Sequence, residues 1–142
     1  METPADYLQQ IPHAAAVGMT VVRHDEVTCI ARVPYAEHLV GDPDTGVLHG
    51  GVLTALLDNT CGMAVRAPGH EPGSVAMATL DLRIDYMDSA EPYSDIYAEA
   101  VCYKRTRNIA FVRATAYQDT AENPIATCVA SFMMNTPNEP RQ

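Results

Sequence analysis

A histidine and two glycines open an apolar segment of this chain, and one carboxylate lies inside that segment. The run is His49-Gly50-Gly51-Val52-Leu53-Thr54-Ala55-Leu56-Leu57-Asp58-Asn59. Glycine lets a backbone approach a ligand closely. The first N–H groups of a helix are unpaired and lie at the positive end of its dipole, which suits an oxygen that gains negative charge. A carboxylate in an apolar helix is costly without a partner or a task, so the pair of features indicates acyl chemistry.

One buried helix must position these residues. Apolar residues between positions 50 and 67 go almost all the way round a helix, which is typical of a helix surrounded by other elements. Pro68-Gly69 is expected to end it. A second, short helix is predicted over residues 5–11, ended by Pro12.

Strands are predicted on both sides of the central helix. Two are expected within 16–33, followed by a loop over 34–48 whose turn residues run from Gly41 to Gly46. Four more are expected over 75–86, 93–103, 109–118 and 124–134, and their short connections predict an antiparallel meander. Within 75–86, the period of two places these side chains inward: Leu80, Leu82, Ile84 and Tyr86. The simplest α+β packing wraps a curved antiparallel sheet of five to six strands around the helix.

The composition is that of one globular domain. The chain has 142 residues, of which 47% are hydrophobic, enough for a core. We expect a single domain over 1–142 with an ordered core over about 16–134. No apolar run approaches the ~20 residues of a membrane span, and the N-terminus lacks the pattern of a signal peptide. A cytoplasmic protein without a membrane partner is therefore expected, and its four widely spaced cysteines are predicted to be buried free thiols.

The charge distribution bears on possible partners. The net charge of −9 argues against nucleic acid. One cluster of bases, Lys104, Arg105 and Arg107, stands out in this acidic chain. It is either a solvated turn or a site for a small anion such as a nucleotide phosphate.

These features together resemble the hotdog fold, and most of all the PaaI-like (phenylacetate-degradation) branch of the hotdog acyl-CoA thioesterases. The resemblance covers residues 16–134. It lies in His49-Gly50-Gly51 at the helix start, an acid nine residues after the histidine (Asp58), and a small hydroxyl residue on the next strand (Thr79).

The resemblance implies a mechanism of thioester hydrolysis. The Gly50 N–H would polarise the thioester carbonyl, and His49 would orient the loop or the carbonyl. Asp58 would act as general base on a water or as the attacking nucleophile, and Thr79 would hold the water or the carboxylate. The sequence does not choose between the two roles of Asp58.

The resemblance also assigns substrate contacts. Gly51 and Asn59 are expected to contact the acyl-CoA, and the basic cluster at 104–107 would meet the phosphates of coenzyme A. No cofactor is expected beyond coenzyme A as part of the substrate, and no metal. The other histidines have no metal-ligand spacing and are expected to be structural or at the surface: His13, His24, His38 and His70.

One position departs from the family pattern. The family often carries Asn or Gln six residues before the histidine, where its amide helps to polarise the carbonyl. Here Pro43 stands there, between Asp42 and Asp44. Proline cannot donate a hydrogen bond, so polarisation of the carbonyl would rest on the Gly50 N–H alone or on a donor that the sequence does not identify.

The spacing of Gly50 and Asp58 predicts a shared site. Eight residues at 1.5 Å each separate them by roughly 12 Å along one helix, so both cannot contact one carbonyl within a subunit. A two-fold homodimer with antiparallel helices would combine Gly50 of one subunit with Asp58 of the other. The resemblance agrees, because paired hotdog subunits share their sites and many members are tetramers.

Three other functions fit these residues less well than hydrolysis. A non-catalytic acyl-CoA binding protein would not need Asp58, and a hotdog dehydratase would need motifs that are absent. A serine hydrolase is excluded because no GxSxG occurs. Small, medium-chain and aryl acyl groups all remain open.

Overall fold

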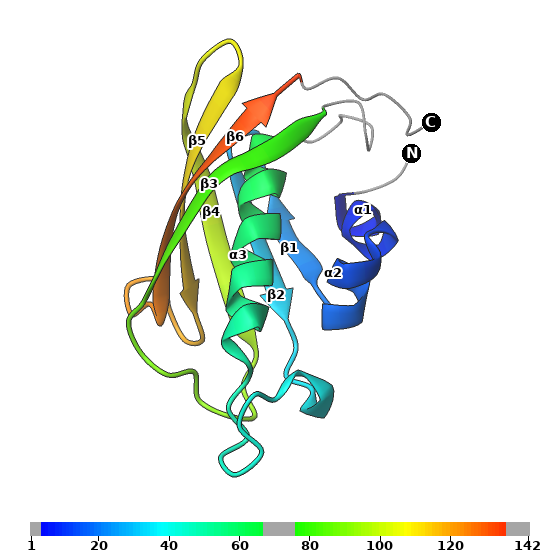
Figure 1. Ribbon diagram of the computed structural model, residues 1–142, viewed down its shortest axis with the longest axis vertical. Helices are drawn as coiled ribbons and strands as arrows, with labels where there is room; N and C mark the ends of the chain where they lie inside the picture. Colours follow the sequence, from blue (N-terminus) through cyan, green and yellow to red (C-terminus); the bar gives the residue numbers. More distant parts are fainter. Residues whose placement is uncertain (1–3, 67–75, 136–142) are drawn as a thin grey trace.

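The computed structural model describes residues 4–66 and 76–135. Six strands form one sheet: β1 (Thr20–His24), β2 (Thr28–Val33), β3 (Met77–Tyr86), β4 (Ile96–Arg105), β5 (Ile109–Tyr117) and β6 (Ala126–Met134). The sheet curves around one long helix, α3 (Gly50–Val65), as Figure 1 shows. This architecture confirms the predicted hotdog fold.

The strand order is β1-β2-β4-β5-β6-β3, and every pair of neighbours is antiparallel. The predicted meander holds for β4, β5 and β6 alone. The prediction that β3 continues it is wrong, because β3 pairs with β6 and leaves β4 beside β2. The long helix between β2 and β3 carries the chain across the sheet, so β3 is adjacent to neither β2 nor β4.

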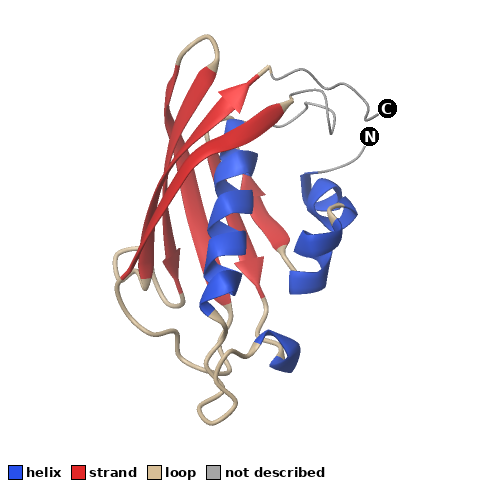
Figure 2. Cartoon of the chain, in the orientation of Figure 1, coloured by secondary structure: helices blue, strands red, loops and turns tan. Residues whose placement is uncertain are grey.

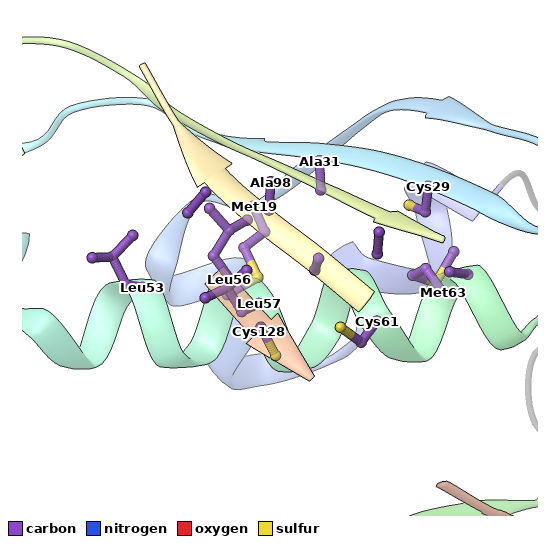
Figure 3. Packing of buried hydrophobic residues seen from close by; sticks show 14 of the residues in the cluster. Met19, Cys29, Ala31, Leu53, Leu56, Leu57, Cys61, Met63, Ala98 and Cys128 are labelled. Atoms are coloured by element: carbon purple, nitrogen blue, oxygen red, sulfur yellow. The ribbon is translucent and has the colours of Figure 1, made fainter. Parts of the chain in front are cut away.

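Small residues on the concave face let α3 lie close to the sheet. Alanines alternate along the central strands and are at most 5% exposed: Ala98, Ala100, Ala110, Ala114, Ala116, Ala126 and Ala130. The large side chains of this core come mainly from the helix, with Leu53, Leu56, Leu57 and Cys61 directed toward the sheet (Figure 3). Burial of such leucines contributes roughly 1.5–3 kcal/mol each. The opposite face of α3 therefore remains available for a site.

Two short helices precede the sheet, not one (Figure 2). The first, α1 (Pro4–Gln10), matches the predicted helix, whereas α2 (Pro12–Val17) lies partly where a strand was expected. Proline in the first turn and the left-handed Gly18 (φ 84°) after the last turn are the signals that would have found α2. Similarly, the predicted loop over 34–48 contains a short 3-10 helix, η1 (Glu37–Leu39).

The outer strand β3 departs from its predicted pattern. Leu82 and Ile84 are half-buried as expected, but Leu80 and Tyr86 are 51% and 54% exposed. A bulge between Thr79 and Asp81 interrupts the alternation. The expected burial is thus wrong for Leu80 and Tyr86 in the single chain, although Tyr86 still faces α3, where its hydroxyl lies 2.6 Å from Thr54 Oγ1.

Several smaller expectations are settled by the structure. Helix α3 ends at Val65, and both Pro68-Gly69 and His70 lie outside the described residues. All four cysteines are free and buried. In the described ranges, no helix combines the length and apolar character needed to cross a membrane.

Candidate active site

His49 caps the N-terminus of α3 with its own side chain. Its Nδ1 accepts a hydrogen bond from the Gly51 N–H at 2.9 Å. An accepting Nδ1 carries no proton, so the neutral ring has its proton on Nε2. A Cβ at position 51 would lie 2.9 Å from Nδ1, which is why this position is glycine. His49 therefore presents an Nε2–H donor beside the start of the helix.

The loop before the helix holds His49 from the other side. Val40 and Leu48 form an isolated antiparallel bridge, and the His49 N–H donates to the Leu39 carbonyl at 2.9 Å. Gly41 passes so close that a Cβ there would lie 2.6 Å from the His49 Cα. The sequence marked Gly41 as a turn residue; only the fold shows that it makes room for His49.

The Gly50 N–H has no acceptor among the described residues. Tyr86, at the end of β3, lies over this point: its hydroxyl is 2.6 Å from Thr54 Oγ1 and 3.4 Å from the Gly50 carbonyl oxygen. The start of α3 is thus fixed by a strand residue while its N–H stays free. Sequence reasoning missed Tyr86 in this role, and no local signal could have found it, because the contact spans 32 to 36 residues.

Asp58 and Thr79 meet on the open face of α3. The Thr79 hydroxyl donates to Asp58 Oδ1 at 3.1 Å. Both residues line a hollow between α3, β3 and α1, together with Asn59. The Asn59 side-chain NH₂ group donates to the Ala55 carbonyl at 2.8 Å, so the Asn59 side-chain oxygen can accept a hydrogen bond from another partner. The structure therefore brings together two of the predicted catalytic residues and one predicted substrate contact.

The structure keeps Gly50 and Asp58 apart. Both are on the straight helix α3, eight residues from each other, so about 12 Å separates them along its axis. Within one chain the free N–H and the carboxylate cannot act on one carbonyl.

The three basic residues at the turn between β4 and β5 differ in their contacts. The Arg105 guanidinium donates to the Val65 carbonyl at the end of α3 and also contacts Met134 Sδ at 3.6 Å. A cation is favourable there because the helix C-terminus is the negative end of the dipole. Lys104 and Arg107 are exposed, and their side chains have no partner among the described residues. These two are free to meet an anion, whereas Arg105 is already engaged.

The loop tip around Pro43, where the family often has Asn or Gln, uses N–H donors for hydrogen bonds within the loop. Pro43 lies between two exposed aspartates, and the Asp44 N–H donates to Asp42 Oδ1 at 3.0 Å. The Gly46 N–H donates to the Asp42 carbonyl at 2.8 Å. Both of these N–H groups are therefore used within the loop.

The remaining histidines of the described chain have structural contacts or line another cavity. His24 Nε2 lies 2.7 Å from the Met63 carbonyl and His38 Nε2 lies 2.9 Å from the Ala16 carbonyl. His13 and His38 line a separate cavity of about 360 Å³ beside His49. No group of three or more potential metal ligands occurs in the described ranges.

Comparison with known proteins places the chain in a family. The sequence model of the thioesterase superfamily matches residues 45–125. A Halobacterium salinarum protein, named as a candidate esterase, is 33% identical over 109 residues, which are 75% of this chain and 71% of that protein. The match to residues 45–125 spans more than half of the chain.

Solved structures agree on the fold. A Pseudomonas aeruginosa protein has 43% identity and a TM-score of 0.78, covering 91% of this chain and 94% of its own. A phenylacetic acid degradation-related protein from Ralstonia eutropha JMP134, titled a candidate thioesterase, has 24% identity and a TM-score of 0.73 over 89% and 95% of the two chains. The second likeness bears on the fold alone. Taken with the sequence match, these findings show that the chain belongs to the thioesterase superfamily.

Proposed function

We propose that this protein hydrolyses acyl-CoA thioesters, as a member of the PaaI-like branch. The observation that carries the proposal is that Asp58, hydrogen-bonded by Thr79 of β3, lies on the same helix that begins with a free Gly50 N–H. Hydrolysis adds water to the thioester carbonyl carbon and breaks its bond to sulfur. The carbonyl oxygen gains negative charge on the way, which a helix N-terminal N–H stabilises.

Asp58 supplies the other half of the chemistry. Its carboxylate either takes the proton of an attacking water or attacks the carbonyl itself to form a mixed anhydride that water then opens. Thr79 fixes Oδ1 and leaves Oδ2 for the water or the carbonyl carbon. The Nε2–H of His49 would lie near the thioester and orient it.

A second copy of the chain would complete the site. β3 is an edge strand of ten residues whose outer side has no partner strand within residues 4–66 and 76–135. Such an edge favours pairing with another strand, and Leu80 and Tyr86 on β3 are exposed hydrophobic residues. Antiparallel pairing of two β3 strands would set two α3 helices side by side in opposite directions, so that Gly50 of one copy approaches Asp58 of the other.

The remaining parts of the proposal concern coenzyme A and assembly. Lys104 and Arg107 would meet the coenzyme A phosphates, because no described residue engages their charges. Exposed Val101, Tyr103 and Val129 on the outer face of the sheet support a dimer of dimers. The proposed location is the cytoplasm.

The test is release of free thiol from a panel of short, medium-chain, long and aryl acyl-CoAs. Asp58→Asn should lower kcat by about 10²–10⁴-fold, while Asp119→Asn, in the exposed turn after β5, should leave it unchanged. The four cysteines are buried, so the protein itself should give a low blank. Tight binding of acyl-CoA without hydrolysis would instead identify a non-catalytic binding protein.

A further inference from the structure

The hollow beside Asp58 and Thr79 continues along α3 and reaches Arg66. It has a volume of about 130 Å³ and is closed on one side by Tyr7, Leu8 and Ile11 around α1. Glycine keeps it open: a Cβ at Gly62 would lie 3.1 Å from Met77 Cε. The hollow is therefore built by several elements and leads away from the carboxylate.

Arg66 contributes a positive charge to this hollow that no acid of the described chain neutralises. The ion pairs in the described ranges are Arg23–Asp25, Arg32–Asp95 and Arg83–Asp85. Asp58 is eight residues away, about 12 Å along the helix, which is beyond the reach of an ion pair. The Arg66 guanidinium lies instead over the ring of Tyr7, 5.0 Å from its centroid. Aromatic contact holds the guanidinium in place without using its hydrogen-bond donors.

The wall between the two charged groups is formed largely by apolar side chains, with Asn59 as a polar one next to Asp58. Met63, Met77 and Phe132 line it on the side of α3 and the sheet, and Leu8 and Ile11 line it on the side of α1. A ligand that fits this order has a thioester at Asp58, an apolar middle and an anionic group at its far end.

We propose that the acyl group of the substrate carries a carboxylate at the end remote from the thioester, and that Arg66 binds this carboxylate. The substrate class is then the mono-CoA thioester of a dicarboxylic acid. The proposal rests on the proposed thioester hydrolysis. The coenzyme A phosphates are the other anionic part of such a substrate, but the unengaged cations suited to them are on the exposed turn at 104–107, whereas Arg66 shares its hollow with Asp58.

The experiment compares acyl groups of equal length with and without the terminal carboxylate. We would measure kcat/KM for succinyl-, glutaryl- and adipyl-CoA against butyryl-, pentanoyl- and hexanoyl-CoA. The wild type should prefer one of the dicarboxylic esters over its partner. Arg66→Met should lower that preference by about 10-fold or more, as expected for loss of a charge-assisted hydrogen bond. Arg66→Lys should retain part of the preference, and the control Arg23→Met, at an exposed position of β1, should retain all of it.

The same acyl groups are then measured as N-acetylcysteamine thioesters, which lack the phosphates of coenzyme A. They show whether Arg66 acts on the acyl group or on the phosphates. Preference for the carboxylate that persists on these short thioesters and disappears in Arg66→Met supports the proposal. If Arg66→Met lowers kcat/KM equally for all CoA esters but not for the short thioesters, Arg66 binds the phosphates of coenzyme A, and the proposal is overturned. An equal loss on every substrate, reproduced by Tyr7→Leu, shows that Arg66 only anchors α1 and also overturns it.

Failure of the proposed hydrolysis is recognised separately. If the wild type cleaves no thioester, calorimetric binding of glutaryl-CoA and pentanoyl-CoA to wild type and Arg66→Met still decides the matter. A preference for glutaryl-CoA that depends on Arg66 supports the proposal, and equal affinities contradict it.

Discussion

The Thr79 hydroxyl donates to Asp58 Oδ1 at 3.1 Å, and this bond joins the edge strand β3 to the open face of α3. Thr79 directly precedes the residue at which β3 bulges. Its hydroxyl has one proton to donate, and a carboxylate can only accept. The strand thus orients the carboxylate at the position where a second copy would pair.

Thr79→Ala should lower kcat by about 10-fold, because the carboxylate loses its orienting donor. Thr79→Ser keeps the hydroxyl and should retain most of the activity. Steady-state kinetics on the best acyl-CoA measures both. Equal losses in the two variants would show that the methyl group, and not the hydrogen bond, is what matters.

Replacement of Gly50 can remove its N–H with little change to the helix. Proline suits the first position of a helix, and His49 before it is already extended (φ −59°, ψ 136°), as the residue before proline requires. Gly50→Pro should therefore lower kcat by about 10²–10³-fold, the usual effect of losing an oxyanion donor, while the melting temperature changes little.

The matched control for that variant is Gly50→Ala, which keeps the N–H. A Cβ at this position meets only Tyr86 Cε1, at 3.9 Å. Gly50→Ala should thus be far more active than Gly50→Pro. Similar rates for the two would remove the Gly50 N–H from the mechanism.

Mixing two inactive variants tests whether sites are shared. Asp58→Asn and Gly50→Pro each inactivate both sites of their own dimer. After unfolding and refolding together, half of the dimers should be heterodimers with one intact site each, so about a quarter of the wild-type activity should return. Mixtures that stay inactive, although mass spectrometry shows heterodimers, would place both groups in one subunit.

Alkaline pH should destabilise the fold through Cys29. Burial raises the pKa of the Cys29 thiol from 9.0 to about 12. Because the pKa of this thiol is higher in the folded than in the unfolded protein, its contribution to the free energy of unfolding is complete below pH 9. That contribution is lost as the pH rises toward 12. The melting temperature of the wild type should fall more steeply between about pH 9 and about pH 12 than that of Cys29→Ala. Parallel falls would show that other groups dominate the alkaline transition.

Local sequence was sufficient for the central helix, for the six strands and for the first residues of the site. The apolar surround of positions 50–65 and the alternation in the strands are consequences of helix and strand periods, so they are visible without coordinates. The glycines and the lone Asp58 were conspicuous because each is costly in an apolar helix unless the fold uses it. Even α2 had a local signal, in Pro12 and Gly18.

Contacts between distant segments were decided by the tertiary structure alone. That β3 pairs with β6, that Tyr86 lies over Gly50, that Arg105 is engaged at the end of α3 and that Arg66 faces the hollow beside Asp58 all depend on the crossover through α3. The sequence by itself determined which residues are chemically unusual, because type and spacing are local properties. Only the folded chain determined which of them meet, because antiparallel pairing of strands is compatible with several orders until the helix and the sheet pack together.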